Sequence, residues 1–443
     1  MSKKRATITR NSDPDKQRIE SFLSFLAGSP TACHAVENCS SALLKENFVC
    51  LKEEDLWKIE PGGRYFVVRN RSSLCAFIAP KKKPIQLNIA ASHTDSPALK
   101  LKPNAEFYKE NMLCLGLEMY GSPLLSSWLN RDLKIAGRVI YKDKAGLVKD
   151  TLVDLDKYPA LIPQLAIHLD RGVNENGTML NKQQQLVALA SISAKTKDHP
   201  AYIESILKEH LPIDEIFSTD LYLVPMEQPR LFGDNQQMIA SYRIDSLASV
   251  HAILTAFIHD IRPSDHAMKM MVLWDNEEVG SQTAQGAGSP FAMQVLERLM
   301  LSLSFSREDY LRLLARSLCV SVDLSHAMPP NYSDKHEPHH LVLLNKGIVI
   351  KTNAQHRYAS DAHSIAVIVR LCKEGKIPFQ YYVSRGDIPC GSTIGPIHAA
   401  LSGMATVDIG SPQLSMHSCR EIAGTIDHLS MCSLLSLYFS ATE

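Results

Sequence analysis

The sequence predicts an α/β fold whose chain is interrupted by a second, strand-rich unit. Apolar runs of strand length end in polar clusters and alternate with stretches of helical periodicity, a pattern typical of sheets covered by helices. From residue 103 to 234 this character changes, and the turn sequences Pro103-Asn104 and Gly233-Asp234-Asn235 mark both limits. We therefore expect one unit formed by residues 1–102 and 235–443, and a second unit formed by residues 103–234.

The elements of the first unit follow from the spacing of its apolar residues. Apolar residues three and four apart indicate helices, and apolar runs bounded by turn residues indicate strands. Ser29-Pro30-Thr31 ends the first helix and caps the second. In chain order we expect helices over 13–27 and 32–46, strands over 65–69, 74–78 and 85–91, a helix that follows Arg243 and extends through 253–257, and strands over 268–273, 318–322 and 342–351.

The second unit is predicted to contain more strand than helix. We expect strands over 134–141, 146–155 and 220–226, and helices over 182–193 and 201–210. Two polar-aromatic spots stand out in it, Trp128-Leu-Asn-Arg-Asp132 and Ile167-His168-Leu-Asp-Arg171. Packing and surface ion pairing account for both when the residues are considered alone.

Composition excludes several classes of function. Lys+Arg 47 balance Asp+Glu 47, so nothing suggests binding to nucleic acid or to an anionic membrane. The basic start, Met1 to Thr7, is not followed by an apolar signal region, and no apolar run is long enough to span a bilayer. The ten cysteines contain no Cys-x-x-Cys pair, which argues against zinc fingers and redox motifs. We expect a cytoplasmic protein whose cysteines are mostly small buried residues.

An acidic cluster at the end of the apolar run 268–273 is the first candidate site. Asp275, Glu277 and Glu278 crowd into four residues. Like charges this close repel, and burying them is costly unless a cation neutralises them. A solvated acidic turn is the competing interpretation, because charge runs usually face water.

Other metal-binding residue types occur at comparable positions. His93 follows the predicted strand 85–91, where open α/β sheets place their ligands, and Asp95 is suitably spaced to orient a metal-bound imidazole. A polar turn and a helix cap are the alternatives for His93 and for Asp245. The His-rich tract 334–340 is polar and contains proline, so we expect it to be a surface loop.

Two His and three carboxylates together match the needs of a two-metal centre. His93, Asp245, Glu278, Asp323 and His417 could supply one bridging carboxylate, and one His plus one carboxylate for each metal. Nitrogen and oxygen ligands without a thiolate fit zinc, or manganese or cobalt in its place. Neighbouring side chains in one loop cannot point the same way, so one glutamate can bind metal while the other acts as general base.

Five motifs occur in order along the chain: His93-Thr-Asp95, Asp275-Asn-Glu277-Glu278-Val-Gly280, Asp323 to Asp334-Lys-His336, Gly391-Ser-Thr-Ile-Gly-Pro396 and Gln413-Leu-Ser-Met-His417. Through them the chain resembles the aspartyl aminopeptidase family of cocatalytic zinc metallopeptidases, from Ser29 to the C-terminus. The resemblance implies a doubly wound mixed-sheet metallopeptidase domain interrupted by a β-rich dimerisation domain. It also implies a homododecamer built from dimers, with enclosed active sites.

The resemblance also implies a role for each site residue. Asp245 would bridge two zinc ions per subunit, with Glu278 and His417 on one ion and His93 and Asp323 on the other. Three catalytic residues would accompany them: Asp95 to orient His93, Glu277 as general base, and His168 reaching a neighbouring subunit's site. The substrate pocket would be lined by Lys351, Tyr358 and His326.

The function implied is removal of an N-terminal Asp or Glu from peptides with a free N-terminus, and the cationic Lys351 suits an acidic side chain. A broad neutral, Leu-type aminopeptidase is the alternative within this class. A metal-stabilised scaffold without activity, and another two-metal hydrolase such as a deacylase or carboxypeptidase, are the alternatives outside it. Three positions depart from the family's common residues: Ser246, Ser122 after Gly121, and His356.

Overall fold

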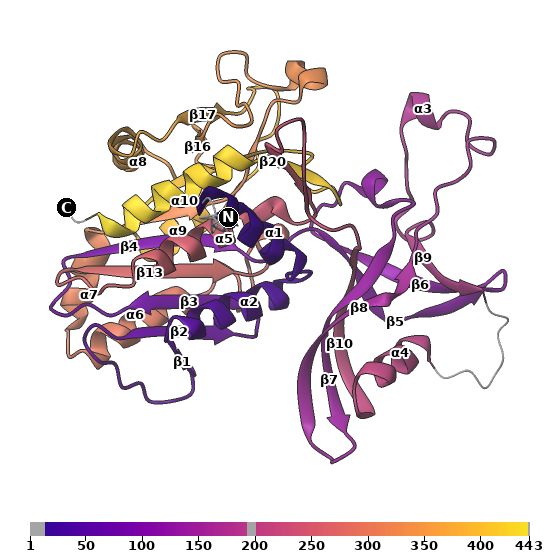
Figure 1. Cartoon of the computed structure of the whole chain (residues 1–443), viewed down its shortest axis with the longest axis horizontal. Helices are drawn as coiled ribbons and strands as arrows, with labels where there is room; N and C mark the ends of the chain where they lie inside the picture. The colour runs from indigo at the N-terminus through magenta and orange to yellow at the C-terminus, as the bar shows by residue number, and fades with distance from the viewer. Residues whose placement is uncertain (1–13, 193–200, 442–443) are drawn as a thin grey trace, which may run out of the picture.

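The computed structural model describes residues 14–192 and 201–441, which form a larger α/β body and a smaller β-rich body side by side (Figure 1). The basic start of the chain and Ser193, the end of a predicted helix, lie outside the described residues. Within the described ranges, no helix combines the length and the apolar character needed to cross a bilayer.

The larger body is built on a nine-stranded mixed sheet. Its central strands are parallel, whereas β3 runs antiparallel to β13 and β16 runs antiparallel to β18. Across the sheet the order is β1 (Val49–Leu51), β2 (Arg64–Arg69), β3 (Ser73–Ile78), β13 (Ala267–Trp274), β4 (Gln86–His93), β14 (Leu318–Val322), β18 (Ala405–Gly410), β16 (Ile348–Thr352) and β17 (Phe379–Val383).

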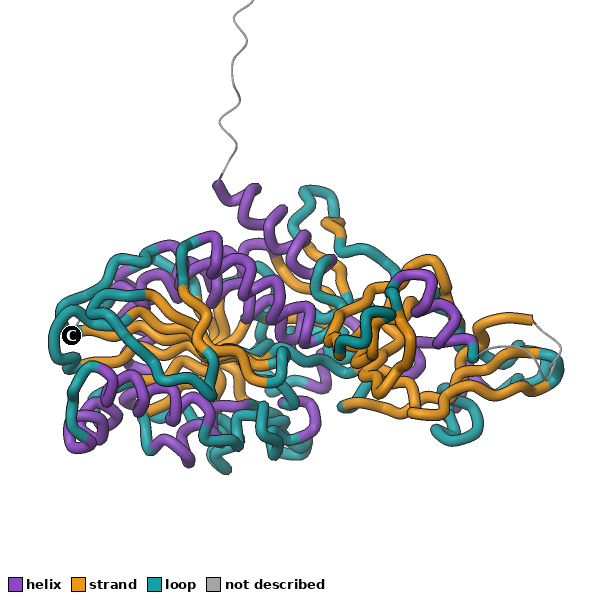
Figure 2. The backbone as a smooth tube through the Cα atoms, turned by 90° about the horizontal axis from the view of Figure 1, so that it is seen from below, coloured by secondary structure: helices purple, strands orange, loops and turns teal. Residues whose placement is uncertain are grey.

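Helices cover both faces of this sheet, so that the strands lie between two helical layers (Figure 2). Successive side chains of a strand point to opposite faces: Met271 and Leu273 of β13 join one apolar cluster, and Met270 and Val272 join the other. The first cluster includes α1 (Pro14–Ala27), α2 (Ala32–Lys45), α5 (Ile244–His259), α8 (Ala362–Glu374) and α10 (Thr425–Ser440). The second includes α6 (Phe291–Ser302), α7 (Arg307–Ala315) and α9 (Ile394–Ser402). The predicted doubly wound mixed-sheet fold is confirmed.

The smaller body is a six-stranded antiparallel sheet with its own apolar core, against which α4 (Tyr202–His210) packs. The order is β8 (Val148–Ala160), β7 (Leu133–Asp143), β10 (Ile213–Pro225), β5 (Ala98–Lys109), β6 (Met112–Tyr120) and β9 (Val187–Ile192). Since β5 begins at Ala98, the predicted limit at 102/103 falls within a strand. Strands β5 and β6 are absent from the expectations based on sequence.

A third, five-stranded sheet lies beside these two and contributes to the site described below. Its order is β11 (Arg230–Phe232), β12 (Met238–Ser241), β20 (Glu421–Gly424), β19 (Pro412–Leu414) and β15 (Ser325–His326). The strands are short and come from distant parts of the sequence, and β12 leads directly into α5.

The helix predicted over 182–193 is wrong. Residues Val187–Ile192 form β9, which pairs antiparallel with β6. The run of Lys, Gln, Leu and Ala before and within it favours a helix locally. Pairing with β6 and burial of Ala188 in the core of the second unit outweigh that preference.

The strand predicted over 342–351 begins later than expected, at Ile348. Asn345 and Gly347 adopt left-handed backbone conformations, which end any extended run before them. At Gly347 an added Cβ would lie 1.9 Å from the Pro378 carbonyl oxygen, so the chain needs glycine there.

Candidate metal centre

Three parallel strands bring their polar ends to one edge of the large sheet. Strands β13, β4 and β14 are neighbours, and Trp274, the last residue of β13, pairs with His93, the last residue of β4. The carboxyl ends of parallel strands meet at one edge. Asp275 and Asp323 therefore follow β13 and β14 on the same side as His93.

Asp245 lies between two histidines from distant parts of the chain. Its Oδ1 is 3.3 Å from His93 Nε2, and its Oδ2 is 3.5 Å from His417 Nε2. Asp245 stands at the start of α5, and His417 stands in the loop between β19 and β20 with a left-handed backbone. One carboxylate thus presents one oxygen to each imidazole.

All five predicted metal ligands come together in two groups that share this carboxylate. One ligand atom from each of His93, Asp245 and Asp323 lies within 4.8 Å of the others, and the same holds for Asp245, Glu278 and His417. Oε1 of Glu278 is buried and accepts no hydrogen bond from a described residue. Buried polar atoms normally have a bonding partner, so a buried carboxylate oxygen that accepts no hydrogen bond is suited to bind a cation.

The electrostatics of the cluster also fit a cation. Burial and the neighbouring carboxylates raise the pKa of Glu277 to about 8 in spite of His93 nearby. Burial and the charge of Asp245 raise the pKa of Glu278 well above its usual value. Burial opposes the charged form of His417, but its contacts with Asp245 and Glu278 prevail and raise the pKa to about 10. The protein part of the site has an excess of negative charge that a divalent ion would balance.

Glu277 and Glu278 bring their carboxylates to the same space from a tight turn, so the expectation that these neighbours cannot point the same way is wrong. Asn276 before it has a left-handed backbone, and Glu277–Val279 form one turn of 3₁₀-helix. Carboxylate oxygens of both glutamates and a ring nitrogen of His93 lie within 4.8 Å of one another. Both line the cavity beside the metal ligands.

Asp95 joins this acidic turn to the histidine before it. Its Oδ1 is 3.4 Å from His93 Nδ1 and accepts the Glu277 backbone N–H, while its Oδ2 accepts the Glu278 backbone N–H. The Tyr120 hydroxyl donates to Oδ2 over 2.6 Å. These bonds explain how Asp95 can hold both the imidazole of His93 and the backbone of the turn in place.

Glu421 is a site residue whose role could not be inferred from its motif. One of its carboxylate oxygens accepts the Asp245 backbone N–H at 3.0 Å and the other accepts the His417 backbone N–H at 2.8 Å. Burial and the nearby Asp245 raise its pKa to about 8. The only local signal is a carboxylate four residues after His417. The contact between Glu421 and the Asp245 backbone is visible only in the folded chain.

The predicted substrate residues line a cavity of about 500 Å³ next to the ligands. Lys351, Tyr358 and His326 are all on its wall, together with Arg357. Lys351 Nζ lies 5.4 Å from the centre of the Tyr358 ring. The cavity thus combines the metal ligands with two cationic side chains.

His168 is the one predicted site residue that stands apart from the others. It lies in an exposed turn of the smaller body, shortly before α3 (Val173–Asn176), and it is not among the residues that line the cavity. His168 therefore does not line the cavity of its own chain. Trp128, in contrast, is fully buried in the core of the smaller body, as the packing interpretation expects.

Comparison with known proteins gives matches over nearly the whole chain. A family model described as "Aminopeptidase I zinc metalloprotease (M18)" matches residues 25–439. A protein of Clostridium acetobutylicum named probable M18 family aminopeptidase 2 is 39% identical over 416 residues, which is 92% of this chain and 95% of that protein. A protein of the same name from Pseudomonas aeruginosa is 38% identical over 430 residues, 96% of this chain and 98% of that protein.

Solved structures match in fold as well. The cryo-EM structure of the Ape4 and Nbr1 complex has a TM-score of 0.91 and 35% identity, over 96% of this chain and 86% of that one. The structure of the S. cerevisiae mApe1 dodecamer has a TM-score of 0.84 and 27% identity, over 96% of this chain and 97% of that one.

Proposed function

The chain belongs to the M18 family of zinc aminopeptidases, and we propose that it removes N-terminal Asp or Glu residues from peptides with two metal ions per subunit. The observation that carries this proposal is the sharing of Asp245 between two groups of His and carboxylate ligands. The cavity beside those groups contains Lys351 and Arg357, and this supports the acidic preference.

The donor set fits two zinc ions, or manganese or cobalt in their place. Asp245 would bridge, Glu278 and His417 would complete one site, and His93 and Asp323 would complete the other. All donors are nitrogen or oxygen, as such ions accept. When bound, two ions of this kind polarise the scissile carbonyl group and make a water molecule acidic enough to attack at neutral pH.

Glu277 acts as general base in this proposal. Its carboxylate would take a proton from the attacking water and return it to the departing amine. A base is most effective when its pKa is near the working pH, and burial already raises that of Glu277. Asp95 and Tyr120 would act as positioning residues, since they hold His93 and the turn that carries Glu277.

The substrate's N-terminal residue would occupy the cavity. Its acidic side chain would meet the cationic Lys351, and Tyr358 and His326 would form the walls. The free amine of the substrate would lie near the carboxylates of the metal centre. This position would restrict cleavage to the first peptide bond.

We further propose a homododecamer built from dimers, with 103–234 as the dimerisation domain and the remainder as the catalytic domain. The similarity to a structure that is described as a dodecamer supports this. In such an assembly the exposed His168 would reach a neighbouring subunit's site and stabilise the oxyanion.

The ten cysteines are free, which suits a reducing, cytoplasmic location.

Metal counting combined with rates on size-fractionated protein tests the proposal. We expect two ions per subunit at the centre that shares Asp245, and the highest kcat/KM on Asp- and Glu-anilides. Faster cleavage of Leu-anilide would favour a broad neutral aminopeptidase. Hydrolysis of N-terminally blocked peptides would favour a different two-metal hydrolase. Two bound ions with no turnover on any of these would favour a scaffold.

Glu277→Gln tests the base assignment. We expect both ions to remain and turnover to fall by about 10²–10⁴-fold, since that is the usual contribution of a positioned base. Glu297→Gln, on the exterior helix α6, is the matched control and should keep full activity. Wild-type turnover in Glu277→Gln would remove Glu277 from this role.

A further inference from the structure

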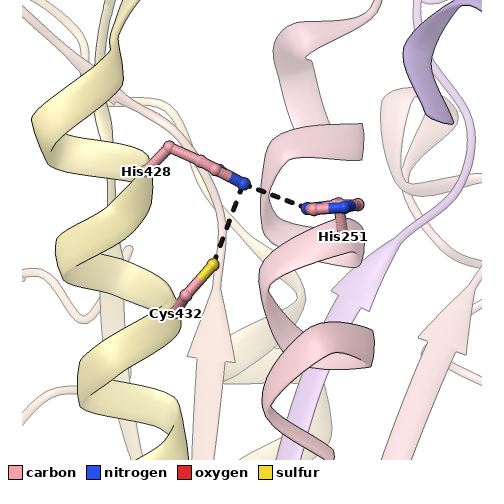
Figure 3. Close-up of side chains that lie close together, drawn as sticks. All are labelled: His251, His428 and Cys432. Carbon is pink, nitrogen blue, oxygen red and sulfur yellow. Dashed lines mark hydrogen bonds between the residues drawn. The ribbon is translucent and has the colours of Figure 1, made fainter. Parts of the chain in front are cut away.

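A second cluster of ligand-type side chains lies in the helical layer, between α5 and α10. His251 of α5 points toward His428 and Cys432 of α10 (Figure 3). His428 and Cys432 are four residues apart, so they project from the same face of their helix. All three are buried, with exposed fractions of 2–3%.

The donor atoms converge. His251 Nδ1 is 3.0 Å from His428 Nε2, and Cys432 Sγ is 3.8 Å from the same nitrogen. One donor atom from each of the three residues lies within 4.8 Å of the other two. Zinc binds nitrogen at about 2.0–2.1 Å and thiolate at about 2.3 Å, so neighbouring donors around it are roughly 3.3–3.6 Å apart. The observed spacing brackets this value.

The outer side of the cluster holds one ring in the orientation that a ligand needs. The Ser21 hydroxyl lies 3.2 Å from His251 Nε2, opposite the nitrogen that faces the cluster. Metal-bound imidazoles commonly donate their other N–H to such an acceptor. Phe22 stacks on the His428 ring at 4.0 Å between centroids, and fixes its plane. Nδ1 of His428 has no partner among the described residues.

We propose that His251, His428 and Cys432 bind a further metal ion, one that accepts both imidazole and thiolate, such as zinc. On binding, the Cys432 thiol would release its proton to solvent and the sulfur would bind the ion as thiolate. A small molecule such as water would complete four-fold coordination. The ion would tie α10 to α5, the helix that begins with the shared carboxylate of Asp245.

Cobalt substitution tests this site separately from the centre at the sheet edge. Ligands there are nitrogen and oxygen only, and Cys432 is the one cysteine that belongs to a possible metal group within residues 14–192 and 201–441. Chelator-treated full-length protein would be titrated with Co²⁺, and the sulfur-to-cobalt charge-transfer band would be followed in the near-ultraviolet. We expect the band, and three ions per subunit, in the wild type.

Cys432→Ser should lose the band and one ion, whereas Cys372→Ser, a buried cysteine of α8 in the same apolar cluster, should keep both. A wild type without the band, or a band that survives Cys432→Ser, would overturn the proposal and leave a hydrogen-bonded core cluster. The wild-type spectrum decides the matter even if Cys432→Ser does not fold. Loss of the two-metal proposal would leave a thiolate band unaffected, so the two failures are distinguishable.

Discussion

Lys351 and Asp323, which both line the cavity, form an ion pair with 3.3 Å between Nζ and Oδ2. The Lys351 side chain is 2% exposed. Lys351 comes from β16 and Asp323 follows β14, so the pair joins two strands that β18 separates. Lys351 therefore has two possible tasks, to neutralise a metal ligand and to bind an acidic substrate, and these can be separated by experiment.

Lys351→Met should reduce kcat/KM on Asp-anilide by about 10–100-fold, because a hydrogen bond to a charged group contributes about 1.5–3 kcal/mol. Leu-anilide should lose much less, so the ratio of the two rates is the measurement. Lys346→Met, at an exposed position in the turn before β16, serves as control. Equal losses on both anilides, together with loss of metal, would assign Lys351 to Asp323 alone.

Tyr120→Phe should weaken metal binding by about 10–100-fold. This is the usual effect of removing a residue that orients a metal ligand through hydrogen bonds. The hydroxyl donates to Asp95 and accepts from Asn276 Nδ2 at 2.9 Å, so its loss frees both the imidazole support and the acidic turn. Competition with a chelator measures the affinity. Tyr222→Phe, whose ring packs edge-on against Tyr120, should bind metal as the wild type does. Unchanged affinity in Tyr120→Phe would exclude this positioning role.

His168→Phe should lower kcat by about 10²–10³-fold in the assembled protein, the usual effect of losing one oxyanion donor. Metal content should not change, because His168 is remote from the ligands of its own chain. His210→Phe, an exposed histidine of the same unit at the end of α4, should remain fully active. A purified monomer with wild-type rates would contradict the role across subunits.

Asp427→Ala should destabilise the fold by about 2–5 kcal/mol, since it leaves two backbone N–H groups without acceptors. The buried carboxylate accepts from Asn345 N at 2.6 Å and from Gly347 N at 2.8 Å, and so holds the turn before β16. Chemical denaturation measures the loss. Asp334→Ala, at an exposed position of the 3₁₀-helix Pro330–Lys335, should shift the midpoint little. An equally small shift in Asp427→Ala would mean that water can replace the carboxylate.

Local patterns were sufficient for α1, α2, α4 and α5 and for six of the nine strands of the large sheet. Strands β1, β17 and β18 and helices α6 to α10 were not expected from the sequence. The runs that end at His93 and before Asp275 and Asp323 are largely apolar, as is usual for strands covered on both faces. Where the pattern failed, at 182–193 and before Ile348, contacts distant in sequence decided the conformation. Pairing with β6 made one a strand, and the crowding of Gly347 by Pro378 delayed the other.

The sequence by itself determined which residue types surround the centre, because imidazoles and carboxylates at strand ends are legible as a pattern and the motifs occur in a recognisable order. Only the tertiary structure decided that Asp245 presents one oxygen to His93 and the other to His417, and that Glu421 and Tyr120 support them. The physical reason is that these contacts depend on strand register and on how α5 packs against the sheet. Interactions between residues more than a hundred positions apart set both.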